Sequence, residues 1–176
     1  RVEGKGSKVF AAACLWALSI PASFQNLVDI VVEASCRYLS GQINAGAEVI
    51  QLFESWAGVL DAAEFEKWVI APTQKIVKYL KTHHPDIPLI GFPRGAGVLT
   101  KDYASQTGVD CVALDQMVPL AWAKENLQHD ITVQGNLDPV RLLCGGEALE
   151  RQTHKILGGL GTSPFIFNLG HGVIKE

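Results

Sequence analysis

The sequence is poor in methionine and has no closely paired cysteines. Met117 is the only methionine among 176 residues, so the chain does not begin with one. We expect either that a leader has been removed or that the chain is part of a longer protein. Its four cysteines (Cys14, Cys36, Cys111 and Cys144) are widely spaced, without a Cys-x-x-Cys pair. This spacing argues against a disulfide framework or a metal site and favours reduced, packed thiols.

The sequence also lacks a basic cluster and a long apolar run. The net charge is −3, with Lys and Arg scattered singly, which argues against a nucleic-acid partner. Its longest apolar runs are about ten residues, too short to cross a bilayer. The segment "RVEGKGSK" has no apolar core of a secretory signal. We therefore expect a cytoplasmic protein without a membrane or nucleic-acid partner.

What the sequence does contain is a globular composition, 48% hydrophobic and 19% charged, with repeated short apolar runs. Five of these runs are apolar at consecutive positions, which is typical of parallel strands covered on both faces. They are "EVIQLFES" (48–55), "PLIGFPRG" (88–95), "DCVALD" (110–115), "ITVQGNLD" (131–138) and "FIFNLGHG" (165–172).

Helical patterns separate these runs. They cover 23–45, 65–80, 100–108, 119–127 and 147–160, with Thr100 as an expected N-cap, Gly108 as a stop and Pro119 in a first turn. Alternating strands and helices predict an α/β fold around a parallel sheet, either doubly wound or a (β/α)₈ TIM barrel. No GxGxxG or GxxxxGK[ST] motif opens a helix, which weakens the usual nucleotide-binding forms of the doubly wound sheet.

The barrel interpretation makes a testable statement about polar residues. Active sites of such barrels lie at the carboxyl ends of the strands. The corresponding positions here are Glu54, Ser55, Arg94, Asp115, Asn136, Asp138 and His171. Five strands do not close an eight-stranded barrel, so we expect an incomplete barrel of about five parallel strands.

Three segments carry a resemblance to a known family. "AGAEVIQLFESWAG" (45–58), "VQGNLDP" (133–139) and "FNLGHG" (167–172) resemble uroporphyrinogen decarboxylases, with "VEGKGSK" (2–8), "GFPRGAG" (91–97) and "ALD" (113–115) in the expected order. The resemblance implies a (β/α)₈ barrel without metal or cofactor, commonly a cytoplasmic homodimer. It also implies that residues 1–176 are the C-terminal part of one barrel domain, with the N-terminal half and the last helix lying outside them.

The family removes CO₂ from the four acetate side chains of uroporphyrinogen, giving coproporphyrinogen in haem and tetrapyrrole synthesis. By this resemblance Ser55 and His171 contact substrate, and Phe53 lines the same cleft. Arg94 is a further cleft candidate, because its charge suits a substrate propionate, although a strand-end arginine pairs with a nearby carboxylate of the protein about as often. The family's decisive aspartate, paired arginines and tyrosine would precede Arg1, so no catalytic residue is expected here and the isolated chain is expected to be inactive.

Several of these residues also have a possible structural role. Gly170 and Gly172 would let the backbone turn and approach a ligand at His171, although a packed histidine is the plainer alternative. Asn136 and Asp138 are expected to make turn bonds before Pro139. Trp16, Trp68 and Trp122 fall in helical patterns, which leaves Trp56 for the cleft. In "VEGKGSK", Lys5 replaces the family's usual glycine.

Three rival functions remain open from the sequence. A Ser55–His171–Asp115 hydrolase triad lacks a GxSxG elbow around the serine. A related zinc-dependent methyltransferase would need a His-x-Cys pair, which the chain does not contain. A non-catalytic half barrel would act as an interaction module and would need its exposed strand edges covered.

Overall fold

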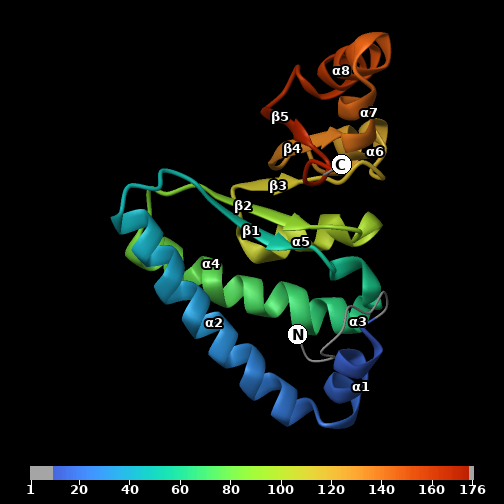
Figure 1. Ribbon diagram of the computed structural model, residues 1–176. Coiled ribbons are helices and arrows are strands. Elements are labelled where there is room, and N and C mark those ends of the chain that lie inside the picture. Colours follow the sequence, from blue (N-terminus) through green and yellow to red (C-terminus); the bar gives the residue numbers. More distant parts are fainter. Residues whose placement is uncertain (1–9, 175–176) are drawn as a thin grey trace.

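A computed structural model describes residues 10–174 and shows one parallel sheet with helices between its strands (Figure 1). The strands are β1 (Ile50–Glu54), β2 (Leu89–Pro93), β3 (Cys111–Ala113), β4 (Thr132–Leu137) and β5 (Phe165–Leu169). Each lies inside one of the five runs identified in the sequence, so the prediction of about five parallel strands is confirmed. Lys5 lies outside the described residues.

The helices are α1 (Ala11–Ser19), α2 (Pro21–Asn44), α3 (Ala62–Phe65), α4 (Ala71–His83), α5 (Thr100–Thr107), α6 (Leu120–Asn126), α7 (Pro139–Cys144) and α8 (Gly146–Leu160). A π-helical segment, Glu66–Ile70, joins α3 to α4, and 3₁₀ turns cover Ala57–Val59 and Gly97–Leu99. The sequence predicted α2, α5, α6 and α8 to within a few residues, and its helical pattern at 65–80 covers the π-helical segment and most of α4. It predicted none of α1, α3 and α7 as a separate element.

The helix boundaries follow from local chemistry. Asp61 caps α3 by accepting the Glu64 N–H at 3.0 Å, and Gly108 ends α5 in the left-handed region at φ 78°. The prediction that Thr100 caps α5 is wrong, because the 3₁₀ turn Gly97–Leu99 runs directly into the helix. Leu99 is the N-cap, and Thr100 is buried in the first turn. Pro119 stands at the N-cap of α6, one place before the predicted first turn.

Strand order decides between the two predicted architectures. The sheet order is β1-β2-β3-β4-β5, identical to the order along the chain. A doubly wound sheet reverses its order at a switch point, whereas a barrel adds each strand beside the one before it. The structure is therefore part of a (β/α)₈ barrel, with β1 and β5 as the two edges.

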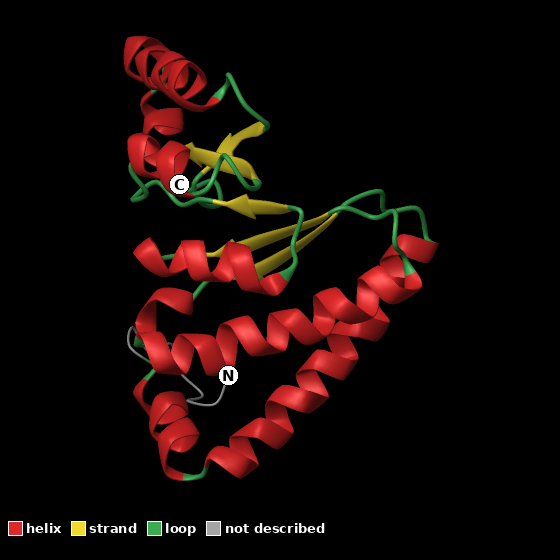
Figure 2. Cartoon of the chain, turned by 180° about the vertical axis from the view of Figure 1, so that it is seen from behind, coloured by secondary structure: helices red, strands yellow, loops and turns green. Residues whose placement is uncertain are grey.

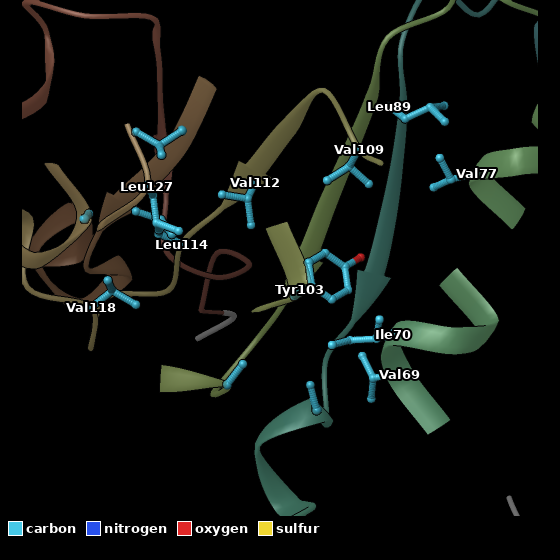
Figure 3. Packing of buried hydrophobic residues seen from close by; sticks show 14 of the residues in the cluster. Val69, Ile70, Val77, Leu89, Tyr103, Val109, Val112, Leu114, Val118 and Leu127 are labelled. Carbon is cyan, nitrogen blue, oxygen red and sulfur yellow. The ribbon is translucent and has the colours of Figure 1, made fainter. Parts of the chain in front are cut away.

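The two faces of the sheet are packed differently. Leu89 and Val112 face the helices and share one large core with Val77 of α4 (Figure 3). On the opposite face Ile90, Phe92, Cys111 and Ala113 form a separate cluster of strand residues only. We call this the inner face, because in a closed barrel it lines the interior.

The inner face is open beside β1. Gln134 Nε2 donates to Gln51 Oε1 at 3.3 Å, which joins β4 to β1 across the curved sheet. Phe53 packs edge-to-face on Phe92 with centroids 6.0 Å apart, yet 66% of it is exposed. The curvature thus already brings distant strands together on this side.

Long helices lie on the other side, below β1 and β2 in Figure 1 and seen from behind in Figure 2. Asp29 of α2 pairs with Lys75 of α4 at 2.6 Å. No described helix is by itself long and apolar enough to span a bilayer. Helices α1 and α2 pass that test of length and composition only as a pair bent by 115°.

Candidate functional site

Polar side chains gather where β1, β2 and β3 end. Ser55 directly follows β1, Arg94 directly follows β2, and Asp115 lies two residues beyond β3. Parallel strands end at one edge of a sheet, and the structure brings these three residues around a single cavity of about 230 Å³. We call it the strand-end cavity. Its lining consists of Ser55, Trp56, Gly58, Val59, Arg94, Gly95, Asp115, Gln116 and Met117.

The loops after β1 and β2 are held together by their backbones. Arg94 N donates to Glu54 O at 3.1 Å, and Gly58 N donates to Arg94 O at 3.1 Å. A Cβ added at Gly58 would lie 2.5 Å from Gly95 O, so only glycine allows this approach. Gly95 itself has a φ of +78°. Ser55 and Arg94 therefore sit on two loops that are in direct contact.

Asp115 connects the second loop to the third. Its Oδ2 accepts the Gly95 N–H at 2.7 Å, and its Oδ1 accepts the Met117 N–H at 2.8 Å. The residue is only 5% exposed. Because both carboxylate oxygens bind backbone amides, this aspartate is not oriented as the third member of a hydrolase triad.

Asn136 and Asp138 have the structural roles that the sequence predicted. Asn136 Nδ2 donates to Asp115 O at 2.9 Å and to Val118 O at 2.8 Å, and the residue is buried. Asp138 caps α7 by accepting the Val140 N–H at 2.9 Å. Both side chains fix the backbone at the carboxyl end of the sheet rather than facing a ligand.

The end of β5 packs on the same loops. Gly170 N donates to Leu137 O at 2.7 Å, and a Cβ on Gly170 would lie 2.4 Å from Gln116 N. Neither Gly170 nor Gly172 has a positive φ, and a Cβ on Gly172 would meet nothing within 4 Å. The expected sharp turn is thus not the reason for these glycines; at Gly170 the reason is close contact with the loop after β3.

His171 follows Gly170 and is exposed at this edge. The pKa of its imidazole is lowered, first by partial desolvation and then by the positive charge of Arg94, while Asp115 acts in the opposite direction. Arg94 and Asp115 thus act on His171 electrostatically, although His171 does not line the strand-end cavity. A bound anion would favour the charged imidazole.

Arg94 carries the positive charge of the strand-end cavity. Among residues 10–174 its guanidinium forms no ion pair. Phe53 lies apart from this cavity, on the inner face of β1. The structure therefore gathers Ser55, Arg94 and Asp115, with His171 beside them and Phe53 on the adjoining face.

Glu54 points to the helix side and is separate from this group. Burial raises the pKa of its carboxyl, and the Trp56 N–H, donating to Glu54 Oε1 at 3.3 Å, opposes that shift. Burial also raises the pKa of Tyr103 to about 12; a hydrogen bond with Thr73 opposes the rise, and the charge of Glu54 adds to it. Of the polar strand-end residues, Glu54 is thus half-buried on the helix side, where it lines a cavity with residues of α2 and α4 and not the strand-end cavity.

The sequence did not single out Gln116 or Gly58. Gln116 lines the strand-end cavity, and its Oε1 is buried without a hydrogen-bond partner among the described residues. The position of Gln116 directly after Asp115 was the only available signal. Gly58 has no positive φ, so its requirement comes entirely from a neighbouring loop that a sequence does not reveal.

The tryptophans are placed as predicted. Trp16 lies in α1, Trp68 in the helical segment before α4, and Trp122 in α6. Trp56 borders the strand-end cavity, is 54% exposed and packs on Phe10 at 4.8 Å between ring centroids. Trp56 is therefore the tryptophan that lines the strand-end cavity, while Trp122 lines a neighbouring cavity that shares Asp115 with it.

All four cysteines are free thiols. Burial, and secondly the charge of Asp110, raises the pKa of Cys111 to about 12, whereas Cys144 is exposed. Within residues 10–174 no group of three or more His, Cys, Asp or Glu side chains is arranged to hold a metal ion.

Known proteins of one family match this sequence along almost its whole length. The model of the uroporphyrinogen decarboxylase (URO-D) family matches residues 1–176. The chain is 50% identical over 175 residues to the uroporphyrinogen decarboxylase of Rhizorhabdus wittichii, covering 99% of this chain and 51% of that protein. It is 49% identical over 175 residues to that of Rhodospirillum rubrum, covering 99% and 50%. The chain thus spans about half the length of these curated relatives, and it belongs to the uroporphyrinogen decarboxylase family.

Proposed function

We propose that the complete protein converts uroporphyrinogen to coproporphyrinogen by decarboxylating its four acetate side chains, a step of haem and tetrapyrrole synthesis. One observation carries this proposal beyond the family match. The strand-end cavity holds the cationic Arg94 and the hydroxyl of Ser55, with His171 beside them, at the edge where barrel enzymes have their active sites.

The reaction needs an electron sink. Breaking the bond between the methylene carbon and the carboxylate releases CO₂ and leaves an electron pair on that carbon. A prior protonation of the electron-rich pyrrole lets the cationic ring accept the pair. A second proton then completes the methyl group, and the ring releases the first proton to become a neutral pyrrole again. Groups that hold the substrate carboxylates and stabilise the cationic ring lower the barrier by preorganised electrostatics.

The side chains of this chain suit the first of these tasks. Arg94 offers a guanidinium for a carboxylate, and Ser55 and His171 offer hydrogen-bond donors. In this proposal Ser55 and His171 bind substrate, Arg94 lines the strand-end cavity, and Phe53 lines the adjoining inner face, which completes the substrate cleft. The carboxylate that stabilises the cationic ring comes from outside residues 1–176. The complete enzyme acts without metal or organic cofactor, as a homodimer in the cytoplasm.

A second candidate is a non-catalytic interaction module. It is favoured by the edges of the sheet, since β1 and β5 each pair on one side only. Phe53 on the inner face is also largely exposed. Such a half barrel would bind a partner through these edges and that face.

The test is a comparison of two polypeptides, the complete protein that contains this chain and residues 1–176 alone. Each is incubated anaerobically with uroporphyrinogen, and the products are separated by chromatography after oxidation to porphyrins. We expect stepwise decarboxylation by the complete protein and none by residues 1–176. If the complete protein leaves uroporphyrinogen unchanged, the enzymatic proposal is rejected and the interaction module becomes the better account.

A further inference from the structure

The loops at the carboxyl edge of the sheet contact one another, and several of these contacts involve Asp115. The loop after β1 contacts the loop after β2 through Gly58 and Gly95, and the loop after β2 is bonded to Asp115 through the Gly95 N–H. On the other side Asn136 and Gly170 reach the backbone of Asp115. Residues at the ends of β2, β4 and β5 therefore contact this one aspartate, and the loop after β1 is joined to it through the loop after β2.

We propose that Asp115 is the positioning residue of the strand-end cavity, holding the loops that carry Ser55, Arg94 and His171 in their relative places. The inference rests on the proposed function only where activity is its readout. It assigns Asp115 no contact with substrate. The aspartate acts through the residues it holds.

The side chain of Asp115 joins two loops. Its two oxygens accept the Gly95 N–H at 2.7 Å and the Met117 N–H at 2.8 Å, while the residue is 5% exposed. Hydrogen bonds from amides to an ionised carboxylate are stronger than bonds between neutral groups, and leaving such amides buried without a partner is costly. The carboxylate therefore restrains the loop that begins with Arg94, as well as its own loop.

The backbone of Asp115 contacts the ends of β4 and β5. Its carbonyl accepts the Asn136 Nδ2–H at 2.9 Å, which joins it to β4. The Cβ that Gly170 lacks would lie 3.0 Å from the carbonyl carbon of Asp115, so the end of β5 lies directly against this peptide. Since His171 follows Gly170, a displacement of Asp115 displaces the imidazole as well.

Electrostatics agree with this placement. The charged groups that act on His171 are Arg94 from the loop after β2 and Asp115 from the loop after β3, with opposite effects on its pKa. A neutral residue at 115 would leave Arg94 unopposed, and the pKa of His171 would fall further. The titration of His171 thus reports on Asp115 without any need for catalysis.

Asp110 provides a matched control at the opposite end of β3. It also binds a backbone amide of the β2 region, accepting the Leu89 N–H at 2.7 Å, and it pairs with Lys81 at 2.6 Å. Both aspartates thus join β3 to β2. Only Asp115 does so beside the strand-end cavity.

The experiment compares Asp115→Asn with Asp110→Asn in the complete protein. It measures unfolding temperature, kcat and KM, the NMR titration of His171 and amide exchange at Gly95. For Asp115→Asn we expect kcat/KM to fall about 10- to 100-fold, the usual scale for misplaced binding groups. We also expect a lower pKa of His171 and faster exchange at Gly95. Asp110→Asn should lose stability while its kcat/KM stays within about twofold, the scale of a surface change away from the site.

A third variant, Asp115→Glu, separates charge from position. It keeps the negative charge but shifts the oxygens by one methylene, so kcat/KM should fall while the pKa of His171 stays closer to its original value. It also keeps the test open if Asp115→Asn does not fold.

The proposal is overturned if the Asp115 variants lose only stability, as Asp110→Asn does, with kcat/KM and the His171 titration unchanged. If the parent protein does not decarboxylate uroporphyrinogen, the proposed function fails. The titration and the exchange rate then still decide the positioning role on their own.

Discussion

At each end of β3 an aspartate accepts a backbone N–H from the β2 region. At the amino end Asp110 accepts the Leu89 N–H and pairs with Lys81, and the side chains of that pair remain 45% and 30% exposed. At the carboxyl end Asp115 is 5% exposed and binds backbone amides only. One carboxylate is satisfied by a solvated ion pair, the other by buried amides.

Among the described residues, this difference leaves a cation free to bind a ligand at the carboxyl end but not at the amino end. Because Asp115 is satisfied by amides, it needs no cation, and within the described part of the chain Arg94 is not taken up in an ion pair. The amino end joins its cation, Lys81, to its aspartate and thereby neutralises the charge there. In barrels the amino face commonly serves stability and the carboxyl face carries the site, and here one pair of aspartates shows how each is built.

The largest effect should come from adding one methyl group beside His171. In Gly170→Ala the new Cβ would lie 2.4 Å from Gln116 N, so the end of β5 must move. We expect a loss of about 1–3 kcal/mol in the free energy of unfolding, as for other overpacked sites. We also expect decarboxylase activity to fall about 100-fold, since His171 moves with the strand end. Denaturant unfolding and product chromatography measure the two effects.

Gly172→Ala is the matched control on the other side of His171. Its Cβ would meet nothing within 4 Å, so stability and activity should stay near those of the parent protein. Equal effects at the two glycines would contradict the contact assigned to Gly170.

The second prediction concerns the imidazole itself. His171→Asn replaces an imidazole that can become charged by a shorter, neutral amide. Hydrogen bonds to charged groups contribute about 1.5–3 kcal/mol, so kcat/KM should fall about 10- to 100-fold if the bond to a substrate carboxylate is lost. Stability at neutral pH should hardly change, because His171 is exposed. His83→Asn, at the exposed end of α4 near the amino edge, should leave kcat/KM unchanged. If kcat/KM fell in His83→Asn and not in His171→Asn, the site would lie at the amino edge and not at the carboxyl edge.

The lowered pKa of His171 also predicts how stability depends on pH. Its folded pKa is lower than the ordinary value of 6.5, so the unfolded chain binds more protons at mildly acidic pH. Stability is therefore lost as the pH falls from above 6.5 toward the folded pKa. His171→Asn should soften that loss, and unfolding curves recorded through this range would show it. A steeper loss in the variant would mean that the pKa shift has the opposite sign.

The third prediction tests the amino edge alone. Lys81→Met removes the ion pair with Asp110 and the Nζ–H bond to Ile87 O at 3.2 Å. We expect a loss of about 1 kcal/mol or less, typical of a partly exposed pair, which would shift Tm by about 2–4 °C. Decarboxylase activity at a temperature well below unfolding should not change. A fall in activity without a fall in Tm would show that the amino edge also serves the site.

The sequence predicted the strands well because each run is apolar on consecutive positions. The inner strands β2, β3 and β4 are buried almost throughout, whereas the edge strands β1 and β5 are more exposed. Where the prediction failed, the cause lay in the loops, in one case a 3₁₀ turn and in the other a contact between loops. Thr100 has the side chain of an N-cap, but a preceding 3₁₀ turn places it inside the helix. Gly170 was interpreted as a turn residue, yet it is needed for packing against a loop more than fifty residues earlier in the chain.

The site was predictable as a set of strand-end positions, and less so as a geometry. Parallel strands bring Ser55, Arg94 and Asp115 to one edge by topology alone. Glu54, one residue from Ser55, faces the helices instead, because successive residues of a strand point to opposite faces. That both oxygens of Asp115 bind amides of two loops depends on three-dimensional structure, which strand patterns do not encode.

The smallest effect is expected at Glu54, the strand-end residue that faces the core. Burial raises the pKa of its carboxyl above the ordinary value of 4.5, so between that value and the raised pKa the folded state holds more protons than the unfolded one. Stability therefore falls as the pH rises through this window, and the cost persists at neutral pH. Glu54→Gln removes the charge and keeps an oxygen for the Trp56 N–H, so it should stabilise the protein slightly at pH 7, with no gain below about pH 4.

Glu147→Gln is the control for this last change, because Glu147 forms an exposed i,i+4 pair with Arg151 at 2.7 Å. Losing that pair should cost about 0.2–0.5 kcal/mol, opposite in sign to the effect at Glu54. Thermal unfolding of both variants from pH 4 to pH 8 compares the two. If Glu54→Gln destabilises the protein at pH 7, the carboxylate is ionised and paired there. Glu54 would then have a partner on the helix side whose interaction with the carboxylate outweighs the cost of burial.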